Sequence, residues 1–282
     1  MKFILIAILT LCIQTMTKSV YDMTEEEFKA ILKPNKPEKF HFIPNDHNPI
    51  YGAFPHNYDA RTLFPSCIHP VRNQGQCGSC WAFAITGALS DRFCIKSPSH
   101  TIDVVLSPQM LVSCDSASVD QGCNGGEGKN GMEYATTHGL VSEECYPYTS
   151  GVTTETGTCL VTAACTDSSV SYKLYKCKDP GPKSYEKNDV IMQEIMDNGP
   201  VFCEYAVYAD FKEYKSGIYY QSSKDLLGLH DIKIIGWGVE NGVNYWLCQN
   251  SWGADWGENG FFRIRMGSAG MCAIAWACEP DV

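Results

Sequence analysis

The chain has few positively charged residues, and these are not clustered in any part of the sequence. Its 282 residues carry 22 Lys and Arg against 32 Asp and Glu, which gives a formal net charge of −10. No basic run, and no basic patch interleaved with aromatic residues, stands out from this acidic background. Proteins that bind nucleic acid gather positive charge to meet the phosphates. The sequence therefore argues against a nucleic-acid partner.

Long hydrophobic runs are scarce as well. Only residues 3–13 form a nearly unbroken apolar stretch, and a membrane-spanning helix needs about 20 such residues. Lys2 precedes this stretch, and small or polar residues follow it up to Ser19. This pattern predicts a secretory signal peptide over residues 1–19 and no membrane anchor. The expected location is the secretory pathway, leading to a lysosome or equivalent acidic vesicle, or the extracellular space.

Cysteine, in contrast, is abundant. Fifteen cysteines behind a secretory leader predict an oxidising compartment and several disulfides. Only one Cys-x-x-Cys pair occurs, Cys77 and Cys80, and no histidine lies at zinc-finger spacing from it. We therefore expect no metal and no organic cofactor.

The stretch from Gln74 to Phe83 reads Gln-Gly-Gln-Cys-Gly-Ser-Cys-Trp-Ala-Phe and carries the strongest chemical signal. Ser79 is a good N-cap residue, and apolar residues recur at helical spacing after it, which predicts a helix over residues 79–94. Cys80 then lies in the first turn, where unpaired N–H groups and the helix dipole favour a thiolate. Cys80 is therefore a candidate nucleophile.

A nucleophilic cysteine needs a base, a residue that orients the base, and a donor to the oxyanion. His230 lies in an apolar segment typical of a buried strand and is the candidate base. Asn250 ends the next predicted strand and can hold the His230 imidazole in the productive tautomer, with Trp252 covering that hydrogen bond. The side-chain amide of Gln74 is the candidate oxyanion donor, beside the backbone N–H of Cys80.

At these residues the sequence resembles the papain-like cysteine peptidases, whose signature stands here as Cys77-Gly-Ser-Cys80-Trp81, and further motifs are similar to the cathepsin B-like type within that family. The resemblance runs from about Tyr58 to about Cys272. Its other motifs are Tyr-Asp-Ala-Arg at 58–61, Cys-Asn-Gly-Gly at 123–126, Val-Tyr-Ala-Asp-Phe at 207–211, Asn-Ser-Trp at 250–252, Asp-Trp-Gly at 255–257 and Gly-Phe-Phe at 260–262.

The resemblance implies an α+β fold of two lobes, a helical left domain and a β-barrel right domain with the catalytic cleft between them. We expect a helical lobe over roughly residues 67–140 and a β-rich lobe over roughly 145–275, within a peptidase domain of residues 55–282. Gly139 should close one helix, and Asn188 or Asp189 should cap another. The patterns predict helices at 79–94, 107–113, 131–138 and 189–198, and strands at 201–208, 217–220, 230–237, 243–249, 260–266 and 271–278.

Residues 20–54 are charged and rich in proline. Thr24 and Glu27 form a capping box that predicts a short amphipathic helix over residues 24–32. The resemblance implies an inhibitory propeptide that lies across the cleft of a zymogen until it is cut near residues 52–55. The alternative is a tail helix packed on the domain.

The cysteine pairing follows from the resemblance alone, because spacing does not fix connectivity. Without Cys12 in the leader and Cys80 as nucleophile, 13 cysteines are left, so at least one is free or intermolecular. Cys203 and Cys248 are expected as buried free thiols, and Cys177, Cys272 and Cys278 have no assignment. The implied disulfides are Cys67–Cys94, Cys77–Cys123, Cys114–Cys159 and Cys145–Cys165.

The stretch from residue 146 to about residue 170 contains no histidine. Cathepsin B carries an occluding loop there, whose His pair binds the C-terminal carboxylate of a substrate. The missing pair predicts an open primed side and endopeptidase activity, as in the loop-less cathepsin B-like enzymes of protists. Expected partners are protein or peptide substrates, the chain's own propeptide and cystatin-like inhibitors, and the chain is expected to be a monomer.

The resemblance also implies where a substrate lies. Gly125 and Gly126 lack side chains and would let the substrate backbone approach closely. Trp252 is counted with the substrate-binding residues, and the S2 pocket falls on Glu127, Gly128, Glu204, Leu229, Asp231 and Ala275.

The acidic residues of this predicted pocket are unusual. Cathepsin B has its acidic residue at the position of Ala275, whereas here Glu204 and Asp231 replace small residues and Glu127 stands at the rim. Carboxylates this close repel one another unless a cation enters or one is protonated. The hypothesis is that a P2 Arg or Lys is accepted, and the alternative is that these side chains turn outward to solvent.

Two other interpretations stay open. Leu229 and Asp231 beside the catalytic histidine would also suit a degenerate papain-like binding protein without activity. Cys77-x-x-Cys80 is formally a redox motif of a thiol-disulfide oxidoreductase, but such a protein has no use for Gln74, His230 and Asn250. The sequence thus predicts a cysteine endopeptidase of cathepsin B-like type, made as a secreted zymogen.

Overall fold

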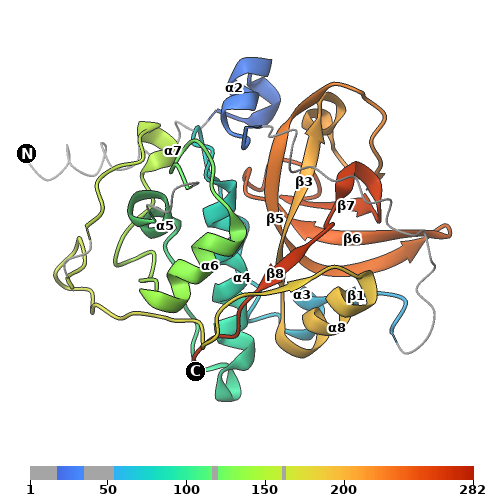
Figure 1. The fold of residues 1–282 in the computed structure, drawn as a ribbon. Coiled ribbons are helices and arrows are strands. Elements are labelled where there is room, and N and C mark those ends of the chain that lie inside the picture. Colours follow the sequence, from blue (N-terminus) through green and yellow to red (C-terminus); the bar gives the residue numbers. More distant parts are fainter. Residues whose placement is uncertain (1–17, 35–53, 116–119, 161–162) are drawn as a thin grey trace, which may run out of the picture.

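The computed structural model describes residues 18–34, 54–115, 120–160 and 163–282. Helices α4 to α7 gather on one side of the molecule, and the strands lie on the other together with α3 and α8, which is the two-lobed α+β arrangement that the sequence predicts (Figure 1). The predicted leader lies almost wholly outside the described residues, and so do residues 35–53 of the predicted propeptide.

The predicted helices are present, with ends that shift by a few residues. The one-turn helices α3 and α7 are not predicted by the sequence pattern, because a single turn carries no apolar periodicity. The helices are α2 (Glu25–Ala30), α3 (Ala60–Leu63), α4 (Cys80–Lys96), α5 (Pro108–Cys114), α6 (Gly128–Thr137), α7 (Ser150–Thr153) and α8 (Asn188–Asn198), with 3₁₀ turns η1 (Val20–Asp22), η2 (Pro98–His100), η3 (Ala209–Glu213) and η4 (Ser268–Gly270).

Helix α4 is the central helix, buried along almost its whole length and in contact with α5, α6 and β5 (Leu226–Glu240). A helix buried on every side needs no single apolar stripe. Ser79 occupies its N-cap position, but the expected side-chain cap is wrong. The Ser79 hydroxyl instead forms a hydrogen bond with the Tyr148 hydroxyl, at 2.7 Å.

The other helix ends follow local chemistry with one exception. The Ser107 hydroxyl accepts from the Met110 N–H at 3.2 Å and caps α5. Gly139 follows α6 with a φ of +84°, which a glycine adopts freely. The predicted cap of α8 by Asn188 or Asp189 is wrong, because the helix begins one residue earlier, after Lys187, and the Asp189 carboxylate accepts from the neighbouring Val190 N–H.

The strands form one sheet in the order β2-β8-β3-β5-β6-β7-β4, with β1 paired to β5. The predicted strands 201–208 and 243–249 are confirmed with these bounds, whereas the predicted strand 230–237 is the middle of a longer β5 that pairs with β3 back to Leu226. The strands are β1 (Tyr58–Asp59), β2 (Lys183–Tyr185), β3 (Val201–Tyr208), β4 (Ile218–Tyr219), β5 (Leu226–Glu240), β6 (Val243–Gln249), β7 (Phe261–Arg265) and β8 (Ala275–Ala277).

The register of β3 and β5 positions the site. These antiparallel strands place Glu204 opposite Asp231 and Tyr205 opposite His230. Strand β5 also contacts α4, the helix that begins at Cys80. The junction of the two lobes therefore carries the candidate residues of both.

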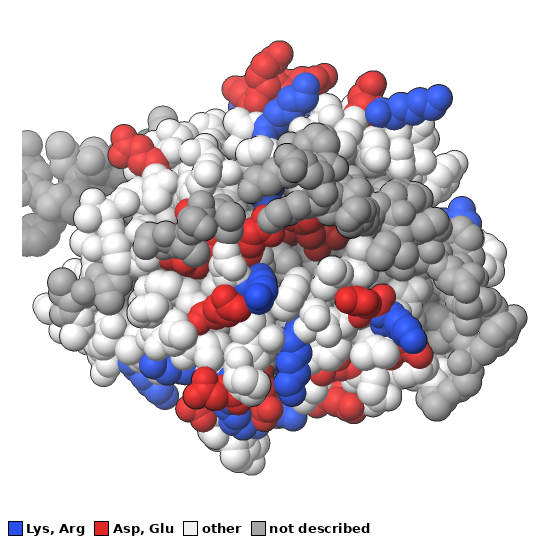
Figure 2. Space-filling model, in the orientation of Figure 1, with Lys and Arg blue, Asp and Glu red and all other residues white. Residues whose placement is uncertain are grey.

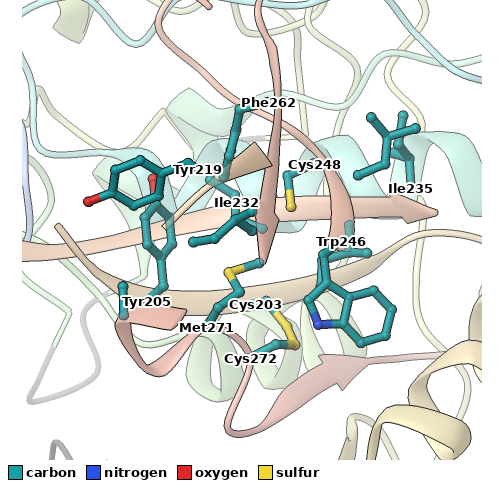
Figure 3. Packing of buried hydrophobic residues seen from close by; sticks show 14 of the residues in the cluster. Cys203, Tyr205, Tyr219, Ile232, Ile235, Trp246, Cys248, Phe262, Met271 and Cys272 are labelled. Atoms are coloured by element: carbon teal, nitrogen blue, oxygen red, sulfur yellow. A yellow bond between two sulfur atoms is a disulfide. The ribbon is translucent and has the colours of Figure 1, made fainter. Parts of the chain in front are cut away.

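Aromatic and aliphatic side chains fill the core of the strand-rich lobe, with Tyr205, Ile232, Trp246 and Phe262 among them (Figure 3). The disulfide between Cys203 and Cys272 lies within this core. The rings of Tyr205 and Phe262 lie 5.7 Å apart between centroids. This packing holds β3 and β5 firmly behind the site.

Six disulfides join the described cysteines. The four that the resemblance implies are present, and Cys177–Cys278 and Cys203–Cys272 add two more. The expectation of a free Cys203 is wrong, because Cys203 lies opposite Ala275 of β8 and the Cys272 N–H donates to Glu204 O at 3.2 Å. The chain that enters β8 thus brings Cys272 beside Cys203. Cys248 is a buried free thiol, as predicted.

Residues 18–34, called the N-terminal segment below, lie against both lobes at the top of Figure 1. The capping box is confirmed, since the Thr24 hydroxyl accepts from the Glu27 N–H and the Glu27 carboxylate accepts from the Thr24 N–H. Phe28 of α2 is fully buried, and its ring meets Trp252 edge-on at 5.2 Å between centroids. The amphipathic helix is therefore docked on the body through its apolar face.

Acidic and basic side chains are interspersed over the described surface in Figure 2, with carboxylates gathered over α2 and along the middle of this face. None of the described helices has the length and apolar character needed to span a membrane.

Candidate active site

Cys80 and His230 lie at the junction of the lobes, and both are fully buried. His230 Nε2 lies 2.7 Å from Asn250 Oδ1, and the Trp252 ring lies over the imidazole at 4.5 Å between centroids. His230 Nδ1 has no hydrogen-bond partner among the described residues. Since Asn250 Oδ1 can only accept, Nε2 carries the proton and Nδ1 is the nitrogen left to act as a base.

The chain after β6 fixes the position of Asn250. The Asn250 N–H donates to Gly260 O at 3.0 Å, and the Ser251 N–H donates to Asn250 Oδ1 at 2.8 Å. The Asn250 oxygen therefore accepts from both the backbone and the imidazole. This double contact sets the direction of the amide and, through it, that of His230.

Gln74 is oriented by two residues to which the sequence gives no role. Gln74 Oε1 accepts from the Ser251 hydroxyl at 2.7 Å, which leaves the side-chain N–H groups free to donate elsewhere. The Tyr148 hydroxyl donates to Gln74 O at 2.8 Å and also bonds to Ser79, next to Cys80. Ser251 lies between Asn250 and Trp252 in the Asn-Ser-Trp motif, so its position in the sequence could have indicated a role at the site. Nothing in the sequence places Tyr148 at this site.

The N-terminal segment contacts candidate site residues from both lobes. Gln74 Nε2 donates to Ile31 O at 2.8 Å and to Cys77 O at 2.9 Å. Lys33 pairs with Leu229 as an antiparallel bridge, through backbone hydrogen bonds of 2.9 and 3.0 Å. A Cβ on Gly125 would lie 3.2 Å from Lys33 Cγ, so the missing side chain makes room for this segment.

The acidic residues of the predicted pocket meet a cation from the N-terminal segment. Lys33 Nζ lies 3.0 Å from the Asp231 carboxylate and forms an ion pair with Glu204. The Lys33 side chain is 7% exposed and that of Asp231 is fully buried. The alternative in which these acidic side chains turn outward therefore does not hold for Asp231. The sequence analysis missed Lys33, whose only signal is a basic residue directly after an apolar stripe.

Burial and opposite charge act against each other in this cluster. Burial would lower the pKa of Lys33, but the carboxylates of Asp231 and Glu204 outweigh it and raise that pKa. Burial raises the pKa of Asp231, with Lys33 acting in the opposite sense. Lys33 is therefore a charged ammonium that neutralises the pocket.

Burial favours the neutral forms of the candidate nucleophile, Cys80, and of the candidate base, His230. Burial raises the pKa of the Cys80 thiol, and the Asp231 charge adds to that effect against the Lys33 ammonium. Burial lowers the pKa of His230 to about 3, and the hydrogen bond that His230 donates to Asn250 opposes this shift. A thiolate–imidazolium pair thus requires that the cleft be uncovered.

Other predicted residues serve packing. A Cβ on Gly126 would lie 2.4 Å from the Trp81 ring, and one on Gly128 would lie 2.3 Å from the Phe202 ring, so both glycines allow close packing inside the protein. Ala275 is fully buried opposite Cys203.

A second buried charge cluster lies on the same strand. Asp91 of α4 is fully buried and pairs with both Lys233 of β5 and His69, whose other ring nitrogen lies 3.0 Å from Asp103. Of these residues, His69 and Lys233 line a small cavity of about 40 Å³ that α4 and β5 border. This cluster is complete within the body of the protein.

Among the described residues, one His and Cys grouping has the spacing of metal ligands: Cys67, Cys94 and His100. The two sulfurs are joined in a disulfide and cannot act as thiolate ligands.

Comparisons with known proteins agree with the geometry. The family described as papain family cysteine protease matches residues 54–279. Cathepsin B-like cysteine proteinase 3 of Caenorhabditis elegans is 40% identical over 233 residues, which cover 76% of this chain and 62% of that protein. Cathepsin B of Dictyostelium discoideum is 37% identical over 249 residues, which cover 84% of this chain and 78% of that protein.

Two solved zymogens are similar in fold. Procathepsin B S9 from Trypanosoma congolense has a TM-score of 0.79 at 25% identity, covering 100% of this chain and 99% of that one. Digestive procathepsin L 3 from the larval midgut of Tenebrio molitor has a TM-score of 0.69 at 26% identity, covering 91% and 79%. The chain therefore belongs to the papain family of cysteine proteases, within which it is a cathepsin B-like cysteine peptidase.

Proposed function

We propose that this protein hydrolyses peptide bonds at a site made of Cys80, His230, Asn250 and Gln74. The observation that carries the proposal is the contact of Gln74 Nε2 with Ile31 O, at 2.8 Å. A carbonyl oxygen from a bound peptide segment already rests on the proposed oxyanion donor. The same donor would hold the oxyanion of a substrate.

The proposed reaction starts when the cleft is uncovered. The Cys80 thiolate attacks the scissile carbonyl carbon, and the negative oxygen that forms accepts hydrogen bonds from Gln74 and the Cys80 N–H. His230 then gives its proton to the leaving amine, and the C–N bond breaks to leave a thioester. Water, deprotonated by His230, attacks the thioester and releases the acid and the thiol. Asn250 keeps the imidazole in the orientation that both steps need.

The N-terminal segment fits an inhibitor better than a substrate. In a substrate, the residue in S2 precedes the residue whose carbonyl lies at the oxyanion donor. Here Ile31 supplies that carbonyl, and Lys33, which fills the acidic pocket, follows it by two residues. The chain thus runs against the direction of a cleavable peptide. We propose that residues 20–54 are an inhibitory propeptide, and that residues 55–282 form the peptidase domain.

The acidic pocket supports a basic P2 preference. Glu204 and Asp231 lie opposite each other on paired strands, and like charges at such positions repel. Lys33 relieves this repulsion in the covered cleft. Once the N-terminal segment leaves, an Arg or Lys side chain at P2 would do the same.

Endopeptidase activity is proposed from the stretch 146–170. It has no histidine to bind a C-terminal carboxylate. The disulfides Cys114–Cys159 and Cys145–Cys165 tie this stretch to the helical lobe. A peptide chain could then continue past the cleft on its primed side, as in the loop-less protist type.

The remaining proposals concern location and partners. The leader-like residues 1–19 and the six disulfides support passage through the secretory pathway to an acidic vesicle or the exterior. Proposed partners are protein or peptide substrates and cystatin-like inhibitors, with the chain acting as a monomer.

The test is hydrolysis of two fluorogenic dipeptides, one with Arg and one with Leu at P2. The full chain is processed at acid pH, beside its Cys80→Ser variant. We expect cleavage by the wild type only, with Arg preferred. Cleavage of the Leu peptide alone would leave the peptidase and remove the acidic-pocket proposal. If correctly processed protein cuts neither peptide, the degenerate binding protein replaces the peptidase.

A further inference from the structure

The strand-rich lobe holds one tyrosine side chain of the N-terminal segment by its hydroxyl and by its ring. The Tyr21 hydroxyl donates to Tyr214 O at 2.8 Å and accepts from the Gly257 N–H at 2.9 Å. Lys215 Nζ lies 2.9 Å from the centre of the Tyr21 ring, and Lys212 Nζ donates to Tyr21 O at 3.2 Å. A phenol hydroxyl can both donate and accept, and here it does both.

The topology of the lobe assembles these groups without help from the N-terminal segment. Strands β4 and β7 are parallel, with Ile218 opposite Arg263, so the turns that precede them meet at the same end of the two strands. The Gly217 N–H donates to Glu258 Oε1 at 2.8 Å, and the Tyr214 hydroxyl donates to Gly217 O at 2.6 Å. These contacts join parts of the body to one another, so they do not depend on the segment.

The direction of the N-terminal segment relates this place to the catalytic centre, a step that rests on the proposed function. Lys33 fills the predicted S2 pocket and Ile31 O lies at Gln74, so the residues before Ile31 continue toward the primed side. Of the ten residue steps from Tyr21 to Ile31, six lie in α2 and rise by about 1.5 Å each. With the other steps at most about 3.5 Å each, the distance is at most about 23 Å, which about seven residues of extended chain can span.

We propose that, in the processed enzyme, Tyr214, Lys215 and Gly257 bind a tyrosine side chain of a protein substrate, about seven residues beyond the scissile bond on the primed side. Removal of the N-terminal segment leaves a carbonyl, an N–H and an ammonium arranged for a phenol ring. A substrate that continues past the cleft brings its own side chain to them. Tyrosine satisfies all three groups, whereas phenylalanine offers only the ring. These three residues are called the tyrosine site below.

The tyrosine site should act on substrate binding and not on the chemical step. A tyrosine several residues from the scissile bond makes the same contacts in the bound substrate and in the transition state, so it should lower KM and leave kcat unchanged. Because one chain joins the cleft to the tyrosine site, even a weak contact there adds to the affinity. Dipeptide substrates end before the tyrosine site and should not respond to it.

The experiment uses the full-length chain after processing and three internally quenched peptides. Each has Arg at P2 and a Gly-Ser spacer on the primed side, and mass spectrometry confirms that the same bond is cut. The first peptide carries Tyr at the seventh primed position, and the second carries Phe there. The third carries Tyr at the second primed position, too close to reach the tyrosine site. We expect the first peptide to have a KM about 5–10-fold below that of the other two, at equal kcat.

A variant tests the ammonium. Lys215→Gln removes the cation that lies over the ring, so KM for the first peptide should rise about 2–5-fold while hydrolysis of an Arg dipeptide stays unchanged. The matched control is Lys183→Gln, which removes an exposed lysine from β2, at the opposite edge of the sheet from β4. This control should leave the KM of every peptide unchanged.

The outcomes separate the tyrosine site from the peptidase. Equal KM values for the first and second peptides, with both cut, would overturn the tyrosine site and leave the peptidase intact. The same advantage for Tyr at the second primed position would also overturn it, because the preference would then belong to the cleft. If the processed protein cuts no peptide, the proposed peptidase fails. Fluorescence anisotropy of the uncut peptides then tests the tyrosine site, since tighter binding of Tyr than of Phe at the seventh position supports it and equal binding overturns it.

Discussion

The oxyanion region and the acidic pocket lie side by side in the cleft but are completed in different ways. Gln74, Ser251, Asn250 and His230 are neutral groups that hold one another by hydrogen bonds within the body of the protein. The pocket, in contrast, pairs Glu204 and Asp231 with a lysine from the N-terminal segment. The proposed chemistry is thus preorganised before activation, whereas the pocket loses its balancing charge when the segment leaves.

The buried carboxylates of Asp91 and Asp231 also differ in whether their cationic partner belongs to the body of the protein. Asp91 finds Lys233 and His69 within the body of the protein. Asp231, two residues before Lys233, depends on Lys33. A buried carboxylate without a permanent partner is costly, and this cost is consistent with a site built to receive a cation.

The largest effect is expected in the oxyanion region, whose hydrogen-bonded groups are neutral. Gln74→Ala removes the donor that contacts Ile31 O, so kcat for peptide hydrolysis should fall by about 10²–10³-fold with little change in KM. Steady-state kinetics on the processed enzyme measure this. Ser251→Ala keeps the donor but frees its orientation, so its loss should be smaller. If Gln74→Ala instead raises KM and leaves kcat unchanged, Gln74 is not an oxyanion donor.

The charged half is tested in the intact zymogen. Lys33→Gln breaks a buried ion pair and leaves two carboxylates unpaired, so an epoxysuccinyl peptide should label Cys80 about 100-fold faster than in the wild type. Mass spectrometry of the labelled chain would confirm that it is uncut. The matched control is Lys29→Gln, which removes an exposed ion pair with Glu25 in the same segment. An exposed pair contributes little, so equal acceleration in both variants would contradict a role for the pocket.

The smallest effect is expected at the second buried charge cluster, in which Asp91 pairs with Lys233 and His69. Burial alone would lower the pKa of His69, but the carboxylates of Asp91 and Asp103 raise it above its ordinary value. Protonated His69 therefore stabilises the fold below about pH 6.5, and this contribution is lost as the pH rises through the higher folded-state pKa. The free energy of unfolding should fall by less than about 1 kcal/mol between pH 6 and pH 8. His69→Asn should flatten that decline in urea titrations, and an unchanged slope would exclude His69 as its source.

The sequence proposed four residues for the neutral half of the site, and the structure brings His230 into contact with Asn250. Cys80, Gln74, His230 and Asn250 stand in long motifs, and one polar contact of Asn250, with the Ser251 N–H, is local in the sequence. Residues 201–208 and 243–249 form strands with the predicted bounds, because they are rich in Val and aromatic residues and follow the turn residues Gly199-Pro200 and Asn241-Gly242.

The sequence indicated the carboxylates of the acidic pocket but not the lysine that pairs with them. The sequence suggested that Glu204 and Asp231 share a pocket, and the register of β3 and β5 places them opposite each other. Their partner Lys33 is 198 residues from Asp231, and no local pattern records so distant a contact. The same limit applies to Cys203, whose bond to Cys272 depends on how the chain returns into β8.

The most direct test of the central claim uses the processed wild-type enzyme and two fluorogenic dipeptides that differ only at P2. One carries Arg and the other citrulline, which has the same shape without the charge. An acidic pocket that needs a cation predicts a kcat/KM at least about 10-fold higher for the Arg peptide. Equal values for the two peptides would contradict the claim. They would mean that Glu204 and Asp231 do not recognise the positive charge of a P2 side chain, although they pair with Lys33 of the N-terminal segment.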